Sequence, residues 1–169
     1  TWCPACGDFA VLASFFNVIQ KLGLTQTDFV CVAGIGCSSR FPYFVNSHGI
    51  HFIHGRALPL ATGISLSRPD QHVFVFGGDG DGFSIGGNHL NHAARKNINL
   101  TYIIISHNLA VVEHMATRVA VMYFGKMVEE AETTMLFANP SHDYTKKLLH
   151  SILRPDPRQG LFRAASQEI

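Results

Sequence analysis

Residues 72–82 read HVFVFGGDGDG, an apolar run that leads directly into a turn rich in glycine and aspartate. A short apolar run bounded by turn residues is typical of a buried strand. The segment from Phe83 to about Lys96 has the pattern of a helix. The order strand, glycine turn, helix predicts an α/β fold built around this turn.

The glycine turn has two interpretations. Glycine lets backbone N–H groups approach a phosphate closely, and a carboxylate in such a turn can hold a divalent ion that bridges to that phosphate. Glycine turns are also common wherever a strand leads into a helix, without any ligand. The stretch by itself leaves both interpretations open.

The composition describes a globular chain. The 169 residues are 47% hydrophobic and 15% charged, which suits one domain or two small pieces. A formal net charge of +1 gives no broad electrostatic reason to expect a nucleic acid or an anionic membrane as partner. No apolar run approaches the roughly 18–20 residues that span a bilayer, and nothing at the start resembles an export signal. We therefore expect a cytoplasmic protein without membrane insertion.

The cysteines favour metal or redox chemistry over disulfides in a cytoplasmic chain. Cys3 and Cys6 form a C-x-x-C motif in which Pro4 tightens the turn, so two thiolates can face one metal centre. A dithiol redox pair or half of a zinc site would have the same spacing. Cys31 lies in the apolar run 29–33, where a buried, inert thiol is expected.

Two further segments complete the predicted first half. Residues 8–22 carry apolar side chains at helical spacing, which predicts one wide apolar face that comprises Phe9, Leu12, Phe15, Phe16, Val18 and Ile19. A strand near residues 29–34 then ends in a loop with Ser38 and Arg40. Ligands of open α/β sheets bind at the carboxyl ends of the strands, where this loop falls.

Histidines gather ahead of a short helix predicted over residues 59–66. His48, His51 and His54 could form a metal cluster, but they lack regular ligand spacing and a nearby carboxylate. His54 and Arg56 are interpreted as polar groups on the phosphate or substrate side of a ligand. Their alternative role is to begin the helix.

Four motifs occur in an order and spacing that is similar to one known family. They are WCPACGD at 2–8, GIGCSSR at 34–40, HGRALP at 54–59 and GDGDG at 78–82. Residues 1–105 resemble the thiamine diphosphate-binding β subunit of 2-oxoacid:ferredoxin oxidoreductases. The resemblance implies an incomplete thiamine diphosphate-binding unit with a doubly wound, mostly parallel sheet.

The resemblance also implies a set of site residues. Asp79 matches the aspartate that coordinates Mg²⁺, which prefers hard oxygen ligands. The family's liganding asparagine falls on His107, and imidazole is a poor Mg²⁺ ligand; Asn108 follows it. The cofactor-binding residues implied are Gly78, Asp79, Gly80, Asp81, Gly82, His54, Arg56, Ser38 and Asn108. No residue is assigned a catalytic role.

Three cysteines match ligands of the family's [4Fe–4S] cluster. Cys3, Cys6 and Cys37 occupy these positions. The fourth ligand belongs to a region of the family that has no counterpart here, so we expect an incomplete cluster site.

A second resemblance begins at Ser106. Residues 106–169 resemble the C-terminal part of the ATP-binding subunit of oligopeptide and dipeptide ABC transporters, through the segments 106–114, 118–130, 138–145 and 155–157. His107 falls on the switch histidine that contacts the γ-phosphate in that family. The chain has no G-x-x-x-x-G-K-[ST] loop, signature loop or acidic strand end, so a structural role for His107 is favoured.

The second half also has a pattern of its own. Two short strands are predicted around residues 124–126, with one helix near 132–137 and another over 143–153. We therefore expect a short tail of a hairpin plus helices.

Three functional hypotheses follow for this hybrid chain, and whether it is an enzyme stays open. The first is a fragment of the β subunit, which would act with an α subunit and ferredoxin in the oxidative decarboxylation of a 2-oxoacid to an acyl-CoA. The second is a transporter remnant that docks to peptide permease subunits. The third is a recombination or assembly join with no function of its own.

Overall fold

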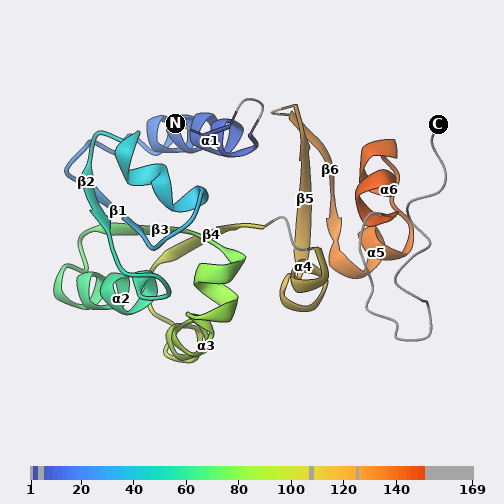
Figure 1. The fold of residues 1–169 in the computed structure, drawn as a ribbon. Helices are drawn as coiled ribbons and strands as arrows, with labels where there is room; N and C mark the ends of the chain where they lie inside the picture. Colours follow the sequence, from blue (N-terminus) through green and yellow to red (C-terminus); the bar gives the residue numbers. More distant parts are fainter. Residues whose placement is uncertain (1, 4–5, 107–108, 125, 151–169) are drawn as a thin grey trace.

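A four-stranded parallel sheet forms the first half of the protein in the computed structural model, which describes residues 2–3, 6–106, 109–124 and 126–150. The strand order is β2-β1-β3-β4 (Figure 1). The strands are β1 Phe29–Ala33, β2 His48–His51, β3 His72–Gly78 and β4 Thr101–Ile105. The parallel register pairs Ala33 with Phe76 and Gly78 with Ile105, so the strands end at one edge of the sheet.

Helices cover both faces of this sheet (Figure 1). Helix α1, Asp8–Lys21, packs on one face, and helices α2, Ala57–Ser67, and α3, Gly87–Arg95, pack on the other. Alternate residues of β1 supply the two cores, because successive side chains of a strand point to opposite faces. Val30 and Val32 join the aliphatic core beneath α2. The predicted α/β fold with a doubly wound, parallel sheet is confirmed.

The core beneath α1 is aromatic. The ring of Phe15 lies 5.1 to 6.1 Å, centroid to centroid, from the rings of Phe29, Phe41, Phe74 and Phe76. The rings of Phe41 and Phe76 stack at 3.9 Å. This packing fixes α1 against β1 and β3.

The predicted apolar face of α1 is too wide. Phe15 is buried, but Phe9, Phe16 and Val18 are 43%, 45% and 46% exposed. A helix that packs on one sheet buries a stripe of side chains at i, i+3, i+4 and i+7, and these three residues lie outside that stripe. The helix ends at Lys21, one residue before the predicted end at Leu22.

Two features of the first half differ from the sequence-based expectation. Strand β2 was not predicted, because it is short and mostly exposed at the sheet edge and so has no apolar run. Helix α3 begins at Gly87 rather than at Phe83, because residues Gly80–Ser84 form a π-helical turn that the amide of Ile85 closes by donating to the carbonyl of Gly80 at 3.1 Å.

The second half holds the predicted hairpin and helices. Helix α4, Leu109–Met115, precedes the antiparallel strands β5, Arg118–Tyr123, and β6, Lys126–Glu132. Helices α5, Thr133–Ala138, and α6, Asp143–His150, follow. Val119, Val121 and Leu136 form the core of this unit. The predicted end of the last helix at Leu153 lies outside the described residues.

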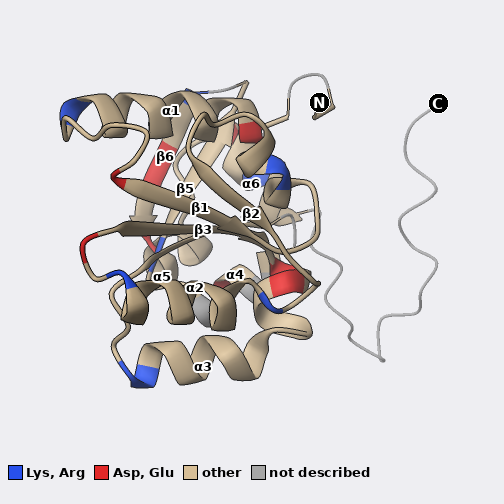
Figure 2. Ribbon diagram, turned by 90° about the vertical axis from the view of Figure 1, so that its left-hand side faces the viewer, with Lys and Arg blue, Asp and Glu red and all other residues tan. Residues whose placement is uncertain are grey.

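Charged residues are scattered over the ribbon without an extended face of one sign (Figure 2). None of the helices in the described part of the chain is long and apolar enough to cross a membrane.

Replacing Phe15 by alanine should lower the free energy of unfolding by about 3–5 kcal/mol, because it leaves a cavity among four rings. Urea denaturation measures this loss. The neighbouring Phe16→Ala is the matched control, and it should cost less than about 1 kcal/mol since Phe16 is half-exposed. Equal losses in the two variants would contradict the assigned core.

Cys31 should resist thiol reagents in the folded protein. It is fully buried, and burial raises its pKa to about 11, so at about pH 8 it carries no reactive thiolate. Titration with an aromatic disulfide reagent should show exposed Cys3 and Cys37 reacting first, and all four cysteines only after denaturation. Cys31→Ala should lower only the denatured count; a lower native count would refute the prediction.

Candidate functional site

The candidate site lies at the carboxyl ends of the parallel strands. Three segments meet there: the loop after β1, the turn after β3 and the loop that leads into α2. Backbone amides of the first and third segments donate to the side chain of Asp81 in the second. The site therefore gathers residues that are far apart in the chain.

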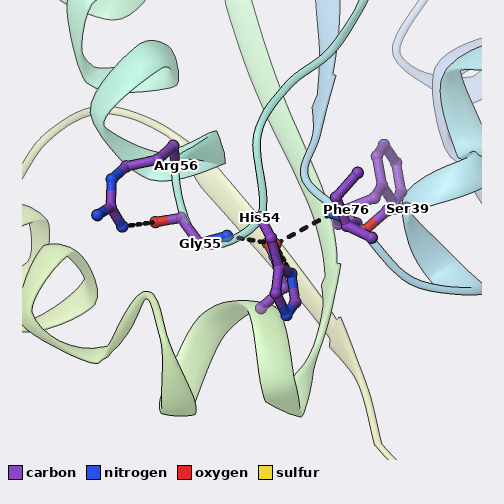
Figure 3. A network of polar contacts seen from close by, with 7 residues as sticks. Ser39, His54, Gly55, Arg56 and Phe76 are labelled. Carbon is purple, nitrogen blue, oxygen red and sulfur yellow. Dashed lines mark hydrogen bonds and ion pairs between the residues drawn. The ribbon is translucent and has the colours of Figure 1, made fainter.

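Asp81 is the centre of this network. Its side chain is 1% exposed, and its Oδ1 accepts hydrogen bonds from the Ile35 amide at 3.1 Å and the Gly55 amide at 2.8 Å. Nδ1 of His54 lies 3.0 Å from the same oxygen. Figure 3 shows His54 and Gly55 side by side, with Arg56 pointing away from His54. A buried carboxylate needs such donors, because its removal from water is otherwise very costly.

Glycines make room for the buried side chains. A Cβ at Gly34 would collide with the Asp81 carboxylate, and one at Gly86 would collide with the Asp81 carbonyl oxygen. A Cβ at Gly82 would lie 2.6 Å from the hydroxyl oxygen of Tyr102. Gly34, Gly82 and Gly86 thus serve packing, whereas a Cβ at Gly80 would meet no atom within 4 Å.

Tyr102 on β4 is a site residue that sequence reasoning missed. Burial, together with the nearby charge of Asp81, raises the pKa of Tyr102 above its ordinary value. The phenol therefore stays neutral beneath the turn. The sequence feature that could have revealed it is a tyrosine inside the apolar run 100–105. In the sheet, Tyr102 pairs with Val75, close to the turn.

Asp79 differs from Asp81 although the two lie in the same turn. It is partly exposed and stands just before the π-helical turn Gly80–Ser84. Within the described residues, its carboxylate has neither a hydrogen bond nor an ion pair. Its oxygens are therefore free to bind a ligand, and a hard oxygen donor of this kind fits Mg²⁺.

The other predicted cofactor-binding residues surround this turn in different ways. Gly78 ends β3. Ser38 is buried at the start of the 3₁₀ helix Ser38–Tyr43, and the guanidinium of exposed Arg56 donates to the carbonyl of Gly55 at 3.3 Å. His107 and Asn108 lie outside the described residues.

Backbone contacts link the segments that carry the predicted cluster cysteines. The indole Nε1 of Trp2 donates to the carbonyl of Cys37 at 2.6 Å, and the amide of Cys6 donates to the carbonyl of Cys3 at 3.1 Å. Burial, with the neighbouring Asp8 carboxylate and Cys37, raises the pKa of Cys6. In the described part of the chain, no three His, Cys, Asp or Glu side chains are placed to hold a metal ion.

The absence of a metal-binding group in the described residues also applies to the histidines. His48, His51 and His54 do not form a metal cluster within the described ranges. Asp8, which the sequence did not single out, is fully buried and accepts a hydrogen bond from the Cys6 thiol at 3.3 Å.

Known proteins resemble 64% of the chain. It is 51% identical over 108 residues to the "2-oxoglutarate oxidoreductase subunit KorB" of Mycobacterium tuberculosis, covering 64% of this chain and 29% of that protein. It is 46% identical over 108 residues to the "2-oxoglutarate synthase subunit KorB" of Methanocaldococcus jannaschii, covering 64% and 40%. The chain thus spans less than half the length of these relatives.

A solved structure agrees with the sequence matches. The 2-oxoglutarate:ferredoxin oxidoreductase from Magnetococcus marinus, with 2-oxoglutarate, coenzyme A and succinyl-CoA bound, is 53% identical. It superposes with a TM-score of 0.63 over 64% of this chain and 37% of that chain.

Two family models match the chain and overlap in the hairpin unit. One, for the C-terminal region of oligopeptide/dipeptide transporters, matches residues 128–168, about a quarter of the chain. The other, for the C-terminal TPP binding domain of thiamine pyrophosphate enzymes, matches residues 34–141, well over half of it. Because this match includes the turn with Asp79 and the network around Asp81, the chain belongs to the thiamine pyrophosphate enzyme family, in its C-terminal TPP binding domain.

Proposed function

We propose that the chain is part of the β subunit of a 2-oxoacid:ferredoxin oxidoreductase and binds thiamine diphosphate through Mg²⁺ at Asp79. The observation that carries this proposal is the contrast within the turn: Asp81 is held by protein donors, whereas the Asp79 carboxylate is free within the described residues. The identity to 2-oxoglutarate oxidoreductase subunits supports the same assignment.

Each residue of the site has a proposed part in holding the cofactor. Asp79 binds Mg²⁺, which bridges to the diphosphate, and the open backbone around Gly80 lets amides approach the phosphate oxygens. Arg56, exposed at the start of α2, supplies a positive charge toward an anionic ligand. When bound, thiamine diphosphate supplies the electron sink for decarboxylation of the 2-oxoacid.

The substrate and partners follow from the relatives. We propose 2-oxoglutarate as the 2-oxoacid, because the relatives and the solved structure described above carry that name. An α subunit completes the enzyme, coenzyme A takes up the acyl group and ferredoxin accepts the electrons. The cytoplasmic location stays a prediction.

An iron–sulfur centre is the second proposed cofactor. Cys3, Cys6 and Cys37 supply three thiolates, and the contacts of Trp2 and Cys6 support their common location. The fourth ligand must come from outside these three residues.

Asp79→Ala should abolish Mg²⁺-dependent binding of thiamine diphosphate, or weaken it by at least about tenfold, because one charged metal ligand is lost. Isothermal titration calorimetry of the chain with and without Mg²⁺ measures this. Asp70→Ala is the control, since exposed Asp70 pairs with Arg68 near the opposite end of β3 and should leave binding unchanged. Full binding by Asp79→Ala would refute the proposed metal site.

A second candidate function rests on the transporter match at residues 128–168. In that case the C-terminal unit docks to a peptide permease, and the chain is a hybrid of two families with a join near residue 105. A join without any function is the third possibility. The domain boundary at residues 105 and 106 stays a prediction.

Sequencing of source DNA across the codons for Asn99 to Glu113 tests the hybrid directly. We expect one uninterrupted reading frame, because the match to the thiamine pyrophosphate enzyme model, residues 34–141, continues past the predicted join. Absence of such an amplicon would assign the two halves to separate proteins and remove the second candidate for this chain.

A further inference from the structure

Among the described residues, three groups contact Oδ1 of Asp81, and two of them are backbone amides that fix the carboxylate in place. The amide of Ile35 follows β1 and that of Gly55 precedes α2, so both belong to segments anchored in the sheet and its helices. Gly34 and Gly86 pack directly against Asp81, because a Cβ at either position would collide with its atoms. The fold therefore sets the position of Oδ1 independently of the contact with His54.

The third donor is a side chain whose hydrogen can occupy either of two nitrogens. A neutral imidazole carries its hydrogen on Nδ1 or on Nε2. Oδ1 of Asp81 already accepts hydrogen bonds from two backbone amides, so it acts as an acceptor. Its 3.0 Å contact with His54 Nδ1 therefore requires the hydrogen on Nδ1. Nε2 is then the nitrogen with a free lone pair.

The His54 ring reaches from the buried carboxylate toward solvent. Its side chain is 42% exposed, whereas that of Asp81 is 1% exposed. Within the described residues, Nε2 of His54 has no hydrogen-bond partner. Nδ1 of the ring thus contacts the protein, and Nε2 is available to a ligand.

We infer that Asp81 is a positioning residue: it holds His54 as the Nδ1–H tautomer and leaves Nε2 as an acceptor beside the turn that contains Asp79. Asp81 acts through His54 and does not itself touch the ligand. This role separates the two aspartates of one motif, because Asp79 is the proposed Mg²⁺ ligand while Asp81 orients an imidazole.

The kind of ligand group that would contact His54 Nε2 can be inferred if the chain binds the proposed cofactor, and this assignment rests on the proposed function. An unprotonated Nε2 accepts a hydrogen bond from an N–H or O–H group, and it repels the lone pairs of a carboxylate or phosphate. We therefore assign Nε2 to a protonated N–H or O–H group of the bound cofactor or substrate. In this proposal the diphosphate interacts with Mg²⁺ at Asp79 and with Arg56 rather than with His54.

Nitrogen-15 NMR of the histidine rings tests the tautomer without any cofactor. A long-range ¹H–¹⁵N spectrum, recorded about two pH units above the ordinary histidine pKa of about 6.5, distinguishes protonated from unprotonated ring nitrogens. The His54 signals are those lost in His54→Gln. We expect a protonated Nδ1 and an unprotonated Nε2 for His54 in the unmodified chain.

Two matched variants show whether Asp81 is the cause. Asp81→Asn, which removes the charge at nearly constant volume, should lose the single Nδ1–H signal and give a mixture of tautomers. Asp79→Asn removes the other carboxylate of the turn, which does not contact His54, and should leave the His54 signals unchanged. An Nε2–H tautomer in the unmodified chain, or an unchanged one in Asp81→Asn, would overturn the inference.

The unmodified chain and Asp79→Asn suffice if Asp81→Asn does not fold. An Nδ1–H tautomer that is the same in both then supports the inference, and any other tautomer in the unmodified chain overturns it.

Calorimetry with thiamine diphosphate separates this inference from the proposed function. The expected tautomer without cofactor binding would refute the function alone, whereas binding with the Nε2–H tautomer would refute the inference alone.

Discussion

The buried carboxylate of Asp81 is the constraint on which the carboxyl edge of the sheet depends. A charge with 1% exposure must be compensated by donors, and the chain supplies two of them from positions 46 and 26 residues away. These hydrogen bonds hold the loop after β1, the turn after β3 and the entry to α2 in one arrangement. The Asp79 carboxylate, which has no partner among the described residues, lies in the turn that these hydrogen bonds hold. The predicted metal ligand therefore takes its position from its buried neighbour.

The sheet that supports this arrangement is packed on its two faces by cores of different composition, one aromatic and one aliphatic. An aromatic cluster around Phe15 and the stacked pair Phe41 and Phe76 holds one face, and an aliphatic cluster beneath α2 holds the other. Both cores take alternate residues of β1 and β3, and so they fix the register that pairs Ala33 with Phe76. A shift of one residue would exchange the two faces and separate the Ile35 amide from Asp81.

The hairpin unit is held together by contacts of its own. The carboxylate of Glu129 on β6 accepts hydrogen bonds from the amides of Ser141 and His142 just before α6, at 2.7 and 3.1 Å. The rings of Tyr123 and Tyr144 stack at 4.1 Å. These contacts tie β5, β6 and α6 together around residues 128–141, where the two family matches overlap.

The sequence by itself determined the strands β1 and β3, the helix α1 and the hairpin, because apolar runs and helical periodicity are local properties of the chain. It also placed His54, Asp79 and Asp81 in one candidate site. It did not reveal the edge strand β2, whose residues are mostly exposed, or the π-helical turn that delays α3 to Gly87.

Only the tertiary structure decided which aspartate of the GDGDG motif is buried and which is free. The two residues are chemically identical and two positions apart, and the motif match that singled out Asp79 as a metal ligand did not predict the burial of Asp81. Their difference arises because amides from distant loops, the glycines at 34 and 86, and the Tyr102 phenol meet at one of the two positions. Long-range packing sets which carboxylate finds donors among the described residues, and it leaves Asp79 as the proposed metal ligand.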